Sequence, residues 1–481
     1  MNAPKLIILL LGGLMCVIHQ PVSAQGSRID GDWQGSLNIQ SFELRIVFHL
    51  QLSKEGKWKA TMDSPDQGAS GIVVDSVFFE NDNARLVVNI VRGEYEGNLE
   101  EGDSAMAGTW RQSGVTFPLN LKKTSTPVVV NRPQEPKPPY PYDEEAVSFP
   151  NSEAGISLAG TLTLPKSGAP FAAAVLISGS GQQDRDENIF NHKPFKVIAD
   201  YLSKNGVAVL RYDDRGKGGS TGDFALATSI DFATDAKTAV AYLQTRKEID
   251  RGKIGLIGHS EGGLIAPMVA SKSHDISFIV LLAGPSLMGK DIILLQDSLI
   301  SLANGVGIDK IRKNQQLGKK MYSIVESEKD TSILRAKLRN YLRSAATELG
   351  DTSAAKEQIE AGIERTAMQI SSPWFRFFLF YDPVPALARV KCPVLALNGE
   401  KDLQVPARVN LEGIKRAADQ GGNSRVTTTM LPDLNHLFQH ASTGSPAEYA
   451  KIEETFAPEA LAIINDWIHS VLRLKKNNVD R

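Results

Sequence analysis

The hydrophobic pattern divides the chain into two parts with different periods. Between residues 28 and 123, apolar and polar residues alternate in short runs, and turn-forming Gly, Asn and Asp residues separate the runs at 42–52, 72–79, 84–91 and 105–110. Alternation with a period of two predicts strands that are buried on one face. Many short strands at this spacing are typical of a barrel or sandwich, so we predict a small all-β, barrel-like domain over residues 25–123.

From residue 144 onwards, continuous apolar runs alternate with helical patterns. The apolar runs are short and lack polar alternation, as is typical of strands buried on both faces of a parallel sheet; they lie at 172–178, 207–212, 254–258, 278–283 and 394–398. Helical periodicity separates them at 193–204 and 231–247. We therefore predict an α/β domain with a doubly wound, mostly parallel sheet over residues 144–475.

Two stretches depart from these patterns. Residues 124–143 are rich in proline, which predicts a stiff linker between the two domains. Residues from 285 to about 380 are helical and charged and carry no strand signal. We predict an insertion of three or four helices there, which ends in an aromatic run from Trp374 to Tyr381 and packs against the sheet domain.

Composition and the N-terminal segment restrict the class of protein. The 481 residues exceed one ordinary domain, and a net charge of −2 without a basic run argues against nucleic acid as a partner. Lys5, the apolar run 6–18 and the small residues at 22–24 predict a cleaved secretory signal over residues 1–24. This run is too short to span a bilayer, so we expect no stable membrane insertion and a periplasmic or extracellular location. Signal removal takes away Cys16 and leaves Cys392 alone, which excludes an internal disulfide.

Ser260 is the candidate nucleophile. It lies in Gly258-His259-Ser260-Glu261-Gly262, with an apolar strand before it and a helical pattern after it. At a strand–turn–helix corner the serine hydroxyl is exposed, and the helix N-terminus points at it. The amide of Glu261 can then stabilise an oxyanion. Without these flanks the five residues would indicate only a structural turn.

A serine nucleophile needs a base, and the base needs an orienting acid. Asp402 follows the strand at 394–398, and His436 follows the strand-like run at 426–431. Loops after the carboxyl ends of strands form the active sites of open α/β sheets. We therefore predict Asp402 as the acid and His436 as the base. The alternatives are Glu400 or Asp433 for the acid and His440 for the base; His259, beside the serine, is predicted to be structural.

The second oxyanion amide is expected in the loop after the strand at 172–177. We predict the amide of Ser180, with Gly181 as the alternative. This loop lacks the third glycine of a dinucleotide fingerprint and the Lys-Ser/Thr pair of a P-loop, and the histidines show no metal-ligand spacing. We therefore expect neither a cofactor nor a metal. The charged clusters 184–186 and 213–215 are predicted to form ion pairs between loops rather than to bind substrate.

Together, these motifs resemble the α/β-hydrolase superfamily, and within it bacterial EstD-type carboxylesterases and serine aminopeptidase-like hydrolases with an N-terminal β-domain. The matching stretches follow in family order over about 300 residues, at 178–187, 211–216, 258–263, 397–402 and 434–438. The resemblance implies the α/β-hydrolase fold with a helical cap, a Ser260–Asp402–His436 triad and esterase activity on short-acyl esters. Ser178 departs from the family, because many members carry histidine before the oxyanion glycine.

Three functions are compatible with these residues. The first is hydrolysis of a small-molecule ester through an acyl-enzyme, and the second is cleavage of peptides or aminoacyl esters by the same groups. The third is a non-catalytic binding module, in which the β-barrel holds a ligand. A complete triad in the right order favours the first. The oligomeric state is open, and a homo-oligomer is compatible with the sequence.

Overall fold

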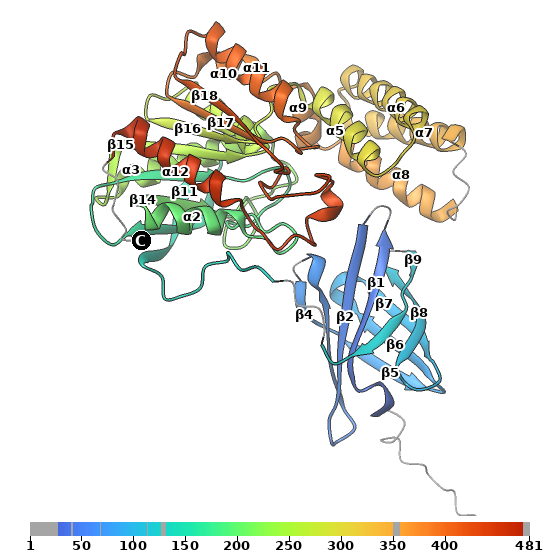
Figure 1. Ribbon diagram of the computed structural model, residues 1–481. Coiled ribbons are helices and arrows are strands. Elements are labelled where there is room, and N and C mark those ends of the chain that lie inside the picture. Colours follow the sequence, from blue (N-terminus) through green and yellow to red (C-terminus); the bar gives the residue numbers. More distant parts are fainter. Residues whose placement is uncertain are drawn as a thin grey trace, which may run out of the picture. The chain divides into compact units, whose positions relative to one another are not determined.

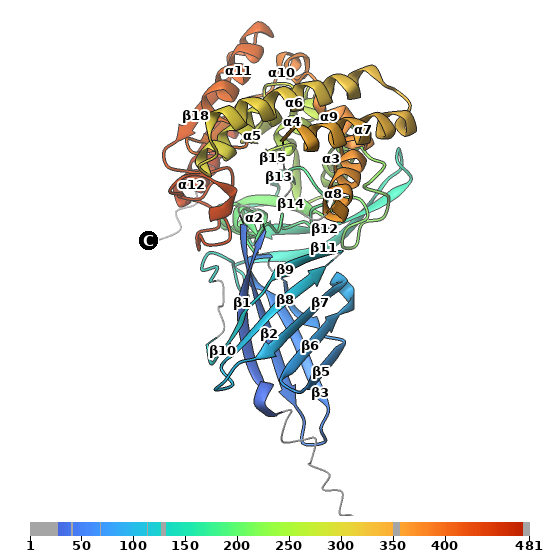
Figure 2. The same cartoon turned by 90° about the vertical axis from the view of Figure 1, so that its right-hand side faces the viewer.

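The computed structural model describes residues 27–39, 42–67, 69–112, 114–126, 131–349 and 356–474. Its described residues fall into two compact units: those up to 39, within 44–64 and within 70–126 form the first, and 42–43, 65–67, 69 and those from 131 onwards form the second. Figures 1 and 2 show the units in two views. The predicted signal segment, residues 1–24, lies outside the described residues. Within the described ranges, no helix combines the length and apolar character needed to cross a bilayer.

The first unit is an antiparallel sheet that curls on itself. Its strands are β1 (Gly31–Ile39), β2 (Phe42–Leu52), β3 (Trp58–Ser64), β4 (Ala69–Val73), β5 (Ser76–Glu80), β6 (Asn83–Val88), β7 (Gly93–Leu99), β8 (Ala105–Gln112), β9 (Val115–Pro118) and β10 (Leu121–Thr124). They follow the order β4-β3-β2-β1-β10-β8-β7-β6-β5, with β9 beside β8. The segment between the two end strands, β4 and β5, bridges the two halves of the sheet. The amide of Val74 donates to the carbonyl oxygen of Ala60 in β3, and the amide of Asp75 donates to the carbonyl oxygen of Val87 in β6.

Large aromatic side chains fill the interior of this unit. Phe48 packs against Tyr95 and Trp110, with ring centroids 5.9 and 6.2 Å apart, and Trp33 is fully buried beside them. The alternating pattern thus predicts the buried face of β2 well. His49, in the same strand, is half-buried, and its Nδ1 lies 2.7 Å from Asp32 and its Nε2 3.0 Å from Asp63. The neighbouring strands supply both carboxylates, which the sequence of one strand cannot reveal.

The second unit contains an eight-stranded sheet with the order β11-β12-β14-β13-β15-β16-β17-β18. The strands are β11 (Tyr142–Asn151), β12 (Ile156–Pro165), β13 (Phe171–Ile177), β14 (Val207–Tyr212), β15 (Ile249–His259), β16 (Phe278–Leu282), β17 (Val394–Gly399) and β18 (Val426–Leu431). β11 and β12 pair antiparallel, and all pairs from β14 to β18 are parallel. The carboxyl ends of the parallel strands therefore meet at one edge.

Helices cover both faces of this sheet. On one face lie α3 (Ser229–Thr245), α4 (Gly262–Ala270), α10 (Val384–Arg389) and α11 (Ala407–Gln420), and on the other lie α2 (Pro194–Lys204) and α12 (Pro458–Leu472). Two separate hydrophobic clusters result, one with side chains of α3, α4 and α11 and one with side chains of α2 and α12. This is the doubly wound α/β architecture predicted for the C-terminal part.

An inserted helical region follows β16. It contains, within the described residues, α5 (Gly289–Ala303), α6 (Ile308–Ser327), α7 (Thr331–Leu349), α8 (Lys356–Ile370) and α9 (Pro373–Phe380), which is one or two helices more than predicted. The insertion has its own core, built from Tyr322, Val325, Leu334, Leu338, Ala367, Ile370, Phe375 and Leu379. Because it leaves the sheet after β16 and returns before β17, it begins at the edge where the parallel strands end.

Most of the proline-rich stretch, which the sequence predicts as a stiff linker over residues 124–143, belongs to the second unit. Residue 124 still belongs to β10, and residue 142 already begins β11. Residues 131–140 belong to the second unit, and Arg132 is only 8 % exposed. Proline prevents helix and sheet pairing but does not prevent side chains between the prolines from binding a neighbouring surface.

Candidate active site

Ser260 occupies the turn between β15 and α4. Its φ is 52°, in the left-handed region that strains a residue other than glycine by roughly 1–3 kcal/mol. The turn is tightly packed: a Cβ added at Gly258 would lie 2.0 Å from the carbonyl oxygen of Gly262, and one added at Gly262 would lie 2.1 Å from the carbonyl oxygen of Ile177. The glycines on both sides are therefore required by close backbone approach, as expected of a nucleophile turn.

His436 and Asp402 form a buried pair at the carboxyl edge of the sheet. Nδ1 of His436 lies 2.8 Å from Oδ2 of Asp402, and the two residues are 5 % and 2 % exposed. The other carboxylate oxygen accepts hydrogen bonds from the amides of Gln404 and Val405, both at 2.8 Å. Since a carboxylate only accepts, Nδ1 carries the proton and Nε2 is left as a base.

The alternative acids and base lie in different surroundings. Asp433 is exposed and pairs with Lys401 at 2.7 Å. His440 is also exposed, and its Nδ1 lies 2.9 Å from Glu454. Glu400 is exposed as well. The structure thus brings His436 to Asp402 and not to the other candidate acids.

His259 connects two loops, the one after β13 and the one that contains His436. Its Nδ1 lies 2.9 Å from Oε1 of Glu187, and its Nε2 lies 3.0 Å from the carbonyl oxygen of His436. Burial lowers the pKa of His259, but the charge and hydrogen bond of Glu187, the hydrogen bond to the carbonyl oxygen of His436 and the charge of Asp402 together outweigh this effect and raise the pKa. Glu187 also accepts the amide of Gly179 at 2.7 Å. The predicted structural role of His259 therefore includes linking the loop after β13 to the His436 loop.

The loop after β13 lies against the nucleophile turn. A Cβ added at Gly179 would lie 3.3 Å from Cβ of Ser260. Among the described residues, the amides of Glu261, Ser180 and the alternative Gly181 all have no hydrogen-bond acceptor. Gly181 has a φ of 93°, which places a sharp bend directly after Ser180.

Ser178 and Gln183, on either side of Ser180, both bind the carboxyl of Asp214. Oγ of Ser178 donates to Oδ1 of Asp214 at 3.0 Å, while the amide of Gln183 donates to Oδ2 of Asp214 at 2.7 Å. Burial raises the pKa of Asp214 to about 7, although these two hydrogen bonds favour the charged form. One carboxyl therefore holds both ends of the loop that contains Ser180.

Glu261 joins the nucleophile turn to the inserted helices. Its Oε1 accepts hydrogen bonds from Oγ of Ser229, at 2.5 Å, and from Nε1 of Trp374, at 2.8 Å. Trp374 belongs to α9, so the aromatic run packs the insertion against the sheet domain, as predicted. Burial raises the pKa of Glu261, although both hydrogen bonds lower it.

The remaining charged clusters form ion pairs, as the sequence predicts. Three arginines, one in β14 and two in neighbouring loops, each bind an aspartate; the pairs are Arg185–Asp213, Arg211–Asp186 and Arg215–Asp235. Each aspartate is enclosed by a partner from another segment, so these groups brace the loops. The described residues contain no group of three or more His, Cys, Asp or Glu side chains arranged to hold a metal ion.

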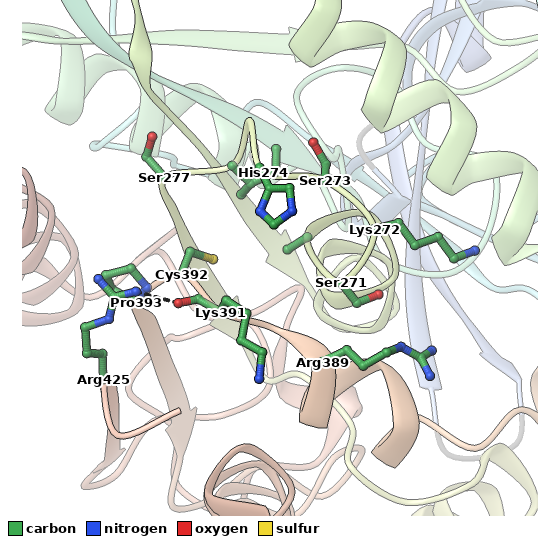
Figure 3. Close-up of a pocket in the computed structure, with 12 residues that line it drawn as sticks. Ser271, Lys272, Ser273, His274, Ser277, Arg389, Lys391, Cys392, Pro393 and Arg425 are labelled. Atoms are coloured by element: carbon green, nitrogen blue, oxygen red, sulfur yellow. Dashed lines mark hydrogen bonds between the residues drawn. The ribbon is translucent and has the colours of Figure 1, made fainter. Parts of the chain in front are cut away.

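A cavity of about 390 Å³ lies at the opposite edge of the sheet, beside the amino ends of β16, β17 and β18 (Figure 3). Its lining includes the cations Lys272, Arg389, Lys391 and Arg425. These side chains lie near helix C-termini, which attract positive charge, and Nζ of Lys391 donates to the carbonyl oxygen of Gly421 at the end of α11. Burial raises the pKa of the Cys392 thiol there to about 11, which leaves it protonated and inert.

The carboxyl edge of the parallel sheet thus carries a strained turn at Ser260 and a buried His436–Asp402 pair. The chain has the fold of α/β hydrolases and resembles members of that superfamily. Residues 192–356 match the family described as "Serine aminopeptidase, S33". The chain is 27 % identical over 295 residues to esterase EstD of Thermotoga maritima, which covers 61 % of each protein. It therefore spans less than two thirds of the length of this curated relative.

The chain also matches solved structures at low identity and low TM-score. Esterase Pf2001 of Pyrococcus furiosus matches 68 % of this chain and 90 % of its own, with 15 % identity and a TM-score of 0.40. The hypothetical protein PA2218 of Pseudomonas aeruginosa matches 72 % of this chain and 99 % of its own, with 16 % identity and a TM-score of 0.43.

Proposed function

We propose that the protein is a serine hydrolase that cleaves small carboxylic esters. The observation that carries the proposal is the buried His436–Asp402 hydrogen bond of 2.8 Å at the sheet edge where Ser260 stands in a strained turn. Similarity to esterase EstD supports an ester as substrate. The proposed substrate is a small molecule, and the chemistry assigned to these residues needs no cofactor.

The reaction follows from the roles of these groups. Nε2 of His436 takes the proton of Ser260 Oγ as that oxygen attacks the acyl carbon. The amides of Glu261 and Ser180 stabilise the oxyanion, and His436 returns the proton to the leaving alcohol. Water then attacks the acyl-enzyme with His436 again as the base. Asp402 keeps the imidazole in the required tautomer and stabilises its cation.

Turnover of p-nitrophenyl acetate by the purified full chain tests the proposal. Ser260→Ala should reduce kcat on the order of 10⁶-fold, since His436 and Asp402 contribute little to catalysis once the serine hydroxyl is removed. Ser271→Ala is the matched control, because Ser271 is a half-buried serine just after the C-terminus of the same helix, α4. Equal activity of the Ser260→Ala variant and the wild type would contradict the assignment.

A second candidate is an aminopeptidase-like hydrolase, which the match of residues 192–356 to the S33 family favours. An amide leaving group needs stronger protonation by His436, and an aminopeptidase must also bind a terminal ammonium group. Rates on aminoacyl-nitroanilides and on acyl esters of matched size separate the two. Faster cleavage of the nitroanilides would replace the esterase proposal.

Export to the periplasm or the extracellular medium is also a proposal, and it rests on Lys5, the apolar run 6–18 and the small residues at 22–24. Cleavage after Ala24 predicts a mature N-terminus at Gln25. Mass spectrometry of the protein recovered outside the cytoplasm tests this, and a chain that retains Lys5 would contradict it.

A further inference from the structure

Arg132, in the proline-rich stretch, binds two loops of the second unit. Its guanidinium donates to four backbone carbonyl oxygens of these loops: those of Phe190 at 2.9 Å, Asn191 at 3.3 Å, Ala450 at 3.4 Å and Ile452 at 2.7 Å. A fifth bond, of 3.1 Å, goes to the carbonyl oxygen of the preceding residue, Asn131. The planar fork of arginine suits several acceptors at once, and a lysine reaches fewer of them. A spacer between domains would not need such a buried contact.

Two further residues of the stretch extend this attachment. Oε1 of Gln134 accepts the amides of Thr455 and Phe456 at 2.6 and 3.0 Å, and Nε2 of Gln134 donates to the carbonyl oxygen of Phe456 at 2.7 Å. Glu135 binds Lys193 at 2.6 Å. We call residues 131–135 the strap, residues 187–193 the first loop and residues 449–457 the second loop.

The first loop reaches the oxyanion side of the site. Glu187 in this loop accepts the amide of Gly179 at 2.7 Å and binds His259, the residue before Ser260. A displacement of the first loop would therefore be transmitted to the segment that carries the amide of Ser180.

The second loop reaches the histidine side. Phe456 stacks on Phe438, two residues after His436, with ring centroids 5.2 Å apart and an interplanar angle of 19°. The amide of Ala457 donates to the carbonyl oxygen of Phe438 at 2.7 Å. These contacts support the turn that contains His436.

A buried histidine also joins the two loops to each other. Nδ1 of His192 lies 3.1 Å from Oγ1 of Thr455, and Nε2 lies 2.9 Å from the carbonyl oxygen of Tyr449. The two loops are therefore joined to each other through His192, and both also accept hydrogen bonds from Arg132 of the strap.

We propose that the strap positions the catalytic groups, with Arg132 and Gln134 as positioning residues that act through the first and second loops. This inference rests on the proposed function, because it assigns the loops to the oxyanion amide of Ser180 and to His436. It also means that the segment N-terminal to the sheet domain is part of the catalytic unit.

The test uses the full chain with Arg132→Ala, Arg132→Lys and Gln134→Ala. Removing the guanidinium should lower kcat on the order of 10- to 100-fold with little change in KM, because a small misplacement of reacting groups affects the transition state most. Arg132→Lys should recover part of kcat. Hydrogen exchange should rise in residues 187–193 and 449–457 and stay unchanged in α6 and α7.

Two controls separate positioning from stability. Lys137→Ala changes an exposed residue of the same proline-rich stretch and should leave kcat unchanged. Arg246→Ala removes an arginine that binds Glu145 at 2.9 Å and Glu248 at 3.1 Å elsewhere in the unit, and it should lower Tm without lowering kcat.

Several results would overturn the proposal that the strap positions the catalytic groups. They are an unchanged kcat in Arg132→Ala, a loss of kcat with no added exchange in the two loops, or exchange that rises over the whole unit. If Arg132→Ala does not fold, Gln134→Ala decides by the same criteria. A wild-type protein that hydrolyses no ester would contradict the proposed function instead, and the exchange measurement would still decide whether the strap holds the loops.

Discussion

Because the carboxyl of Asp214 is buried, the free energy of unfolding of the protein should fall as the pH rises from about 4 to about 7. Burial raises its pKa to about 7 in the folded protein, against roughly 3.9 in an unfolded chain. Between these values the unfolded chain releases the proton while the folded protein keeps it. The free energy of unfolding therefore falls progressively as the pH rises to about 7 and stays at its lower value above that pH. A pKa difference of about 3, at about 1.4 kcal/mol for each unit, corresponds to about 4 kcal/mol.

Asp214→Asn isolates this effect. An asparagine can keep both hydrogen bonds, with its oxygen accepting the amide of Gln183 and its nitrogen donating to Ser178, but it does not titrate. The free energy of unfolding of the variant relative to the wild type should therefore increase by about 4 kcal/mol between pH 4 and pH 8.

Urea unfolding of both proteins at pH 4, 6 and 8 measures this difference. Asp433→Asn is the control. Asp433 is exposed, and its hydrogen bond with Lys401 lowers its pKa. The free energy of unfolding of this variant relative to the wild type should therefore fall, not rise, as the pH increases. A difference between Asp214→Asn and the wild type that is the same at all three pH values would refute the assigned protonation of Asp214.

Three other substitutions test separate contacts. Asp402→Asn should lower kcat on the order of 10⁴-fold without loss of fold, because His436 then adopts the wrong tautomer; a loss under about tenfold would argue for another acid. Trp374→Phe removes a donor to the buried carboxyl of Glu261 and should cost about 1–3 kcal/mol of stability, measured by urea unfolding, and an unchanged midpoint would contradict that contact. Gly262→Ala places a Cβ 2.1 Å from a backbone carbonyl of β13, so soluble folded protein should be lost, and a normal Tm would disprove the tight turn.

Local patterns predicted the parallel strands, including the edge strand β18, and missed the antiparallel strands β11 and β12. The run at 207–212 coincides with β14 because that strand is buried on both faces and has no polar residue except Arg211. β11 has a largely exposed surface and contains charged residues such as Glu144 and Glu145, so its apolar signal is diluted. Its strand character comes from pairing with β12 along its whole length.

The candidate triad could be named from the sequence because each member follows a recognisable strand in a fixed order. The supporting residues could not. Glu187 meets His259 across 72 residues, and Trp374 meets Glu261 across 113. Neither pairing has a local signature, although Glu187 stands inside a stretch that resembles the family. The contacts of Arg132 were missed for the same reason, since prolines on both sides indicate only an extended chain.

The central claim is that Ser260 is the nucleophile, and covalent labelling tests it most directly. The folded full chain is treated with a fluorophosphonate, digested and mapped by mass spectrometry, with Ser260→Ala and Ser271→Ala in parallel. We predict one adduct, on Ser260, in the wild type and in Ser271→Ala, and none in Ser260→Ala. An adduct on another residue, or an unlabelled Ser260 in protein that hydrolyses esters, would contradict the account.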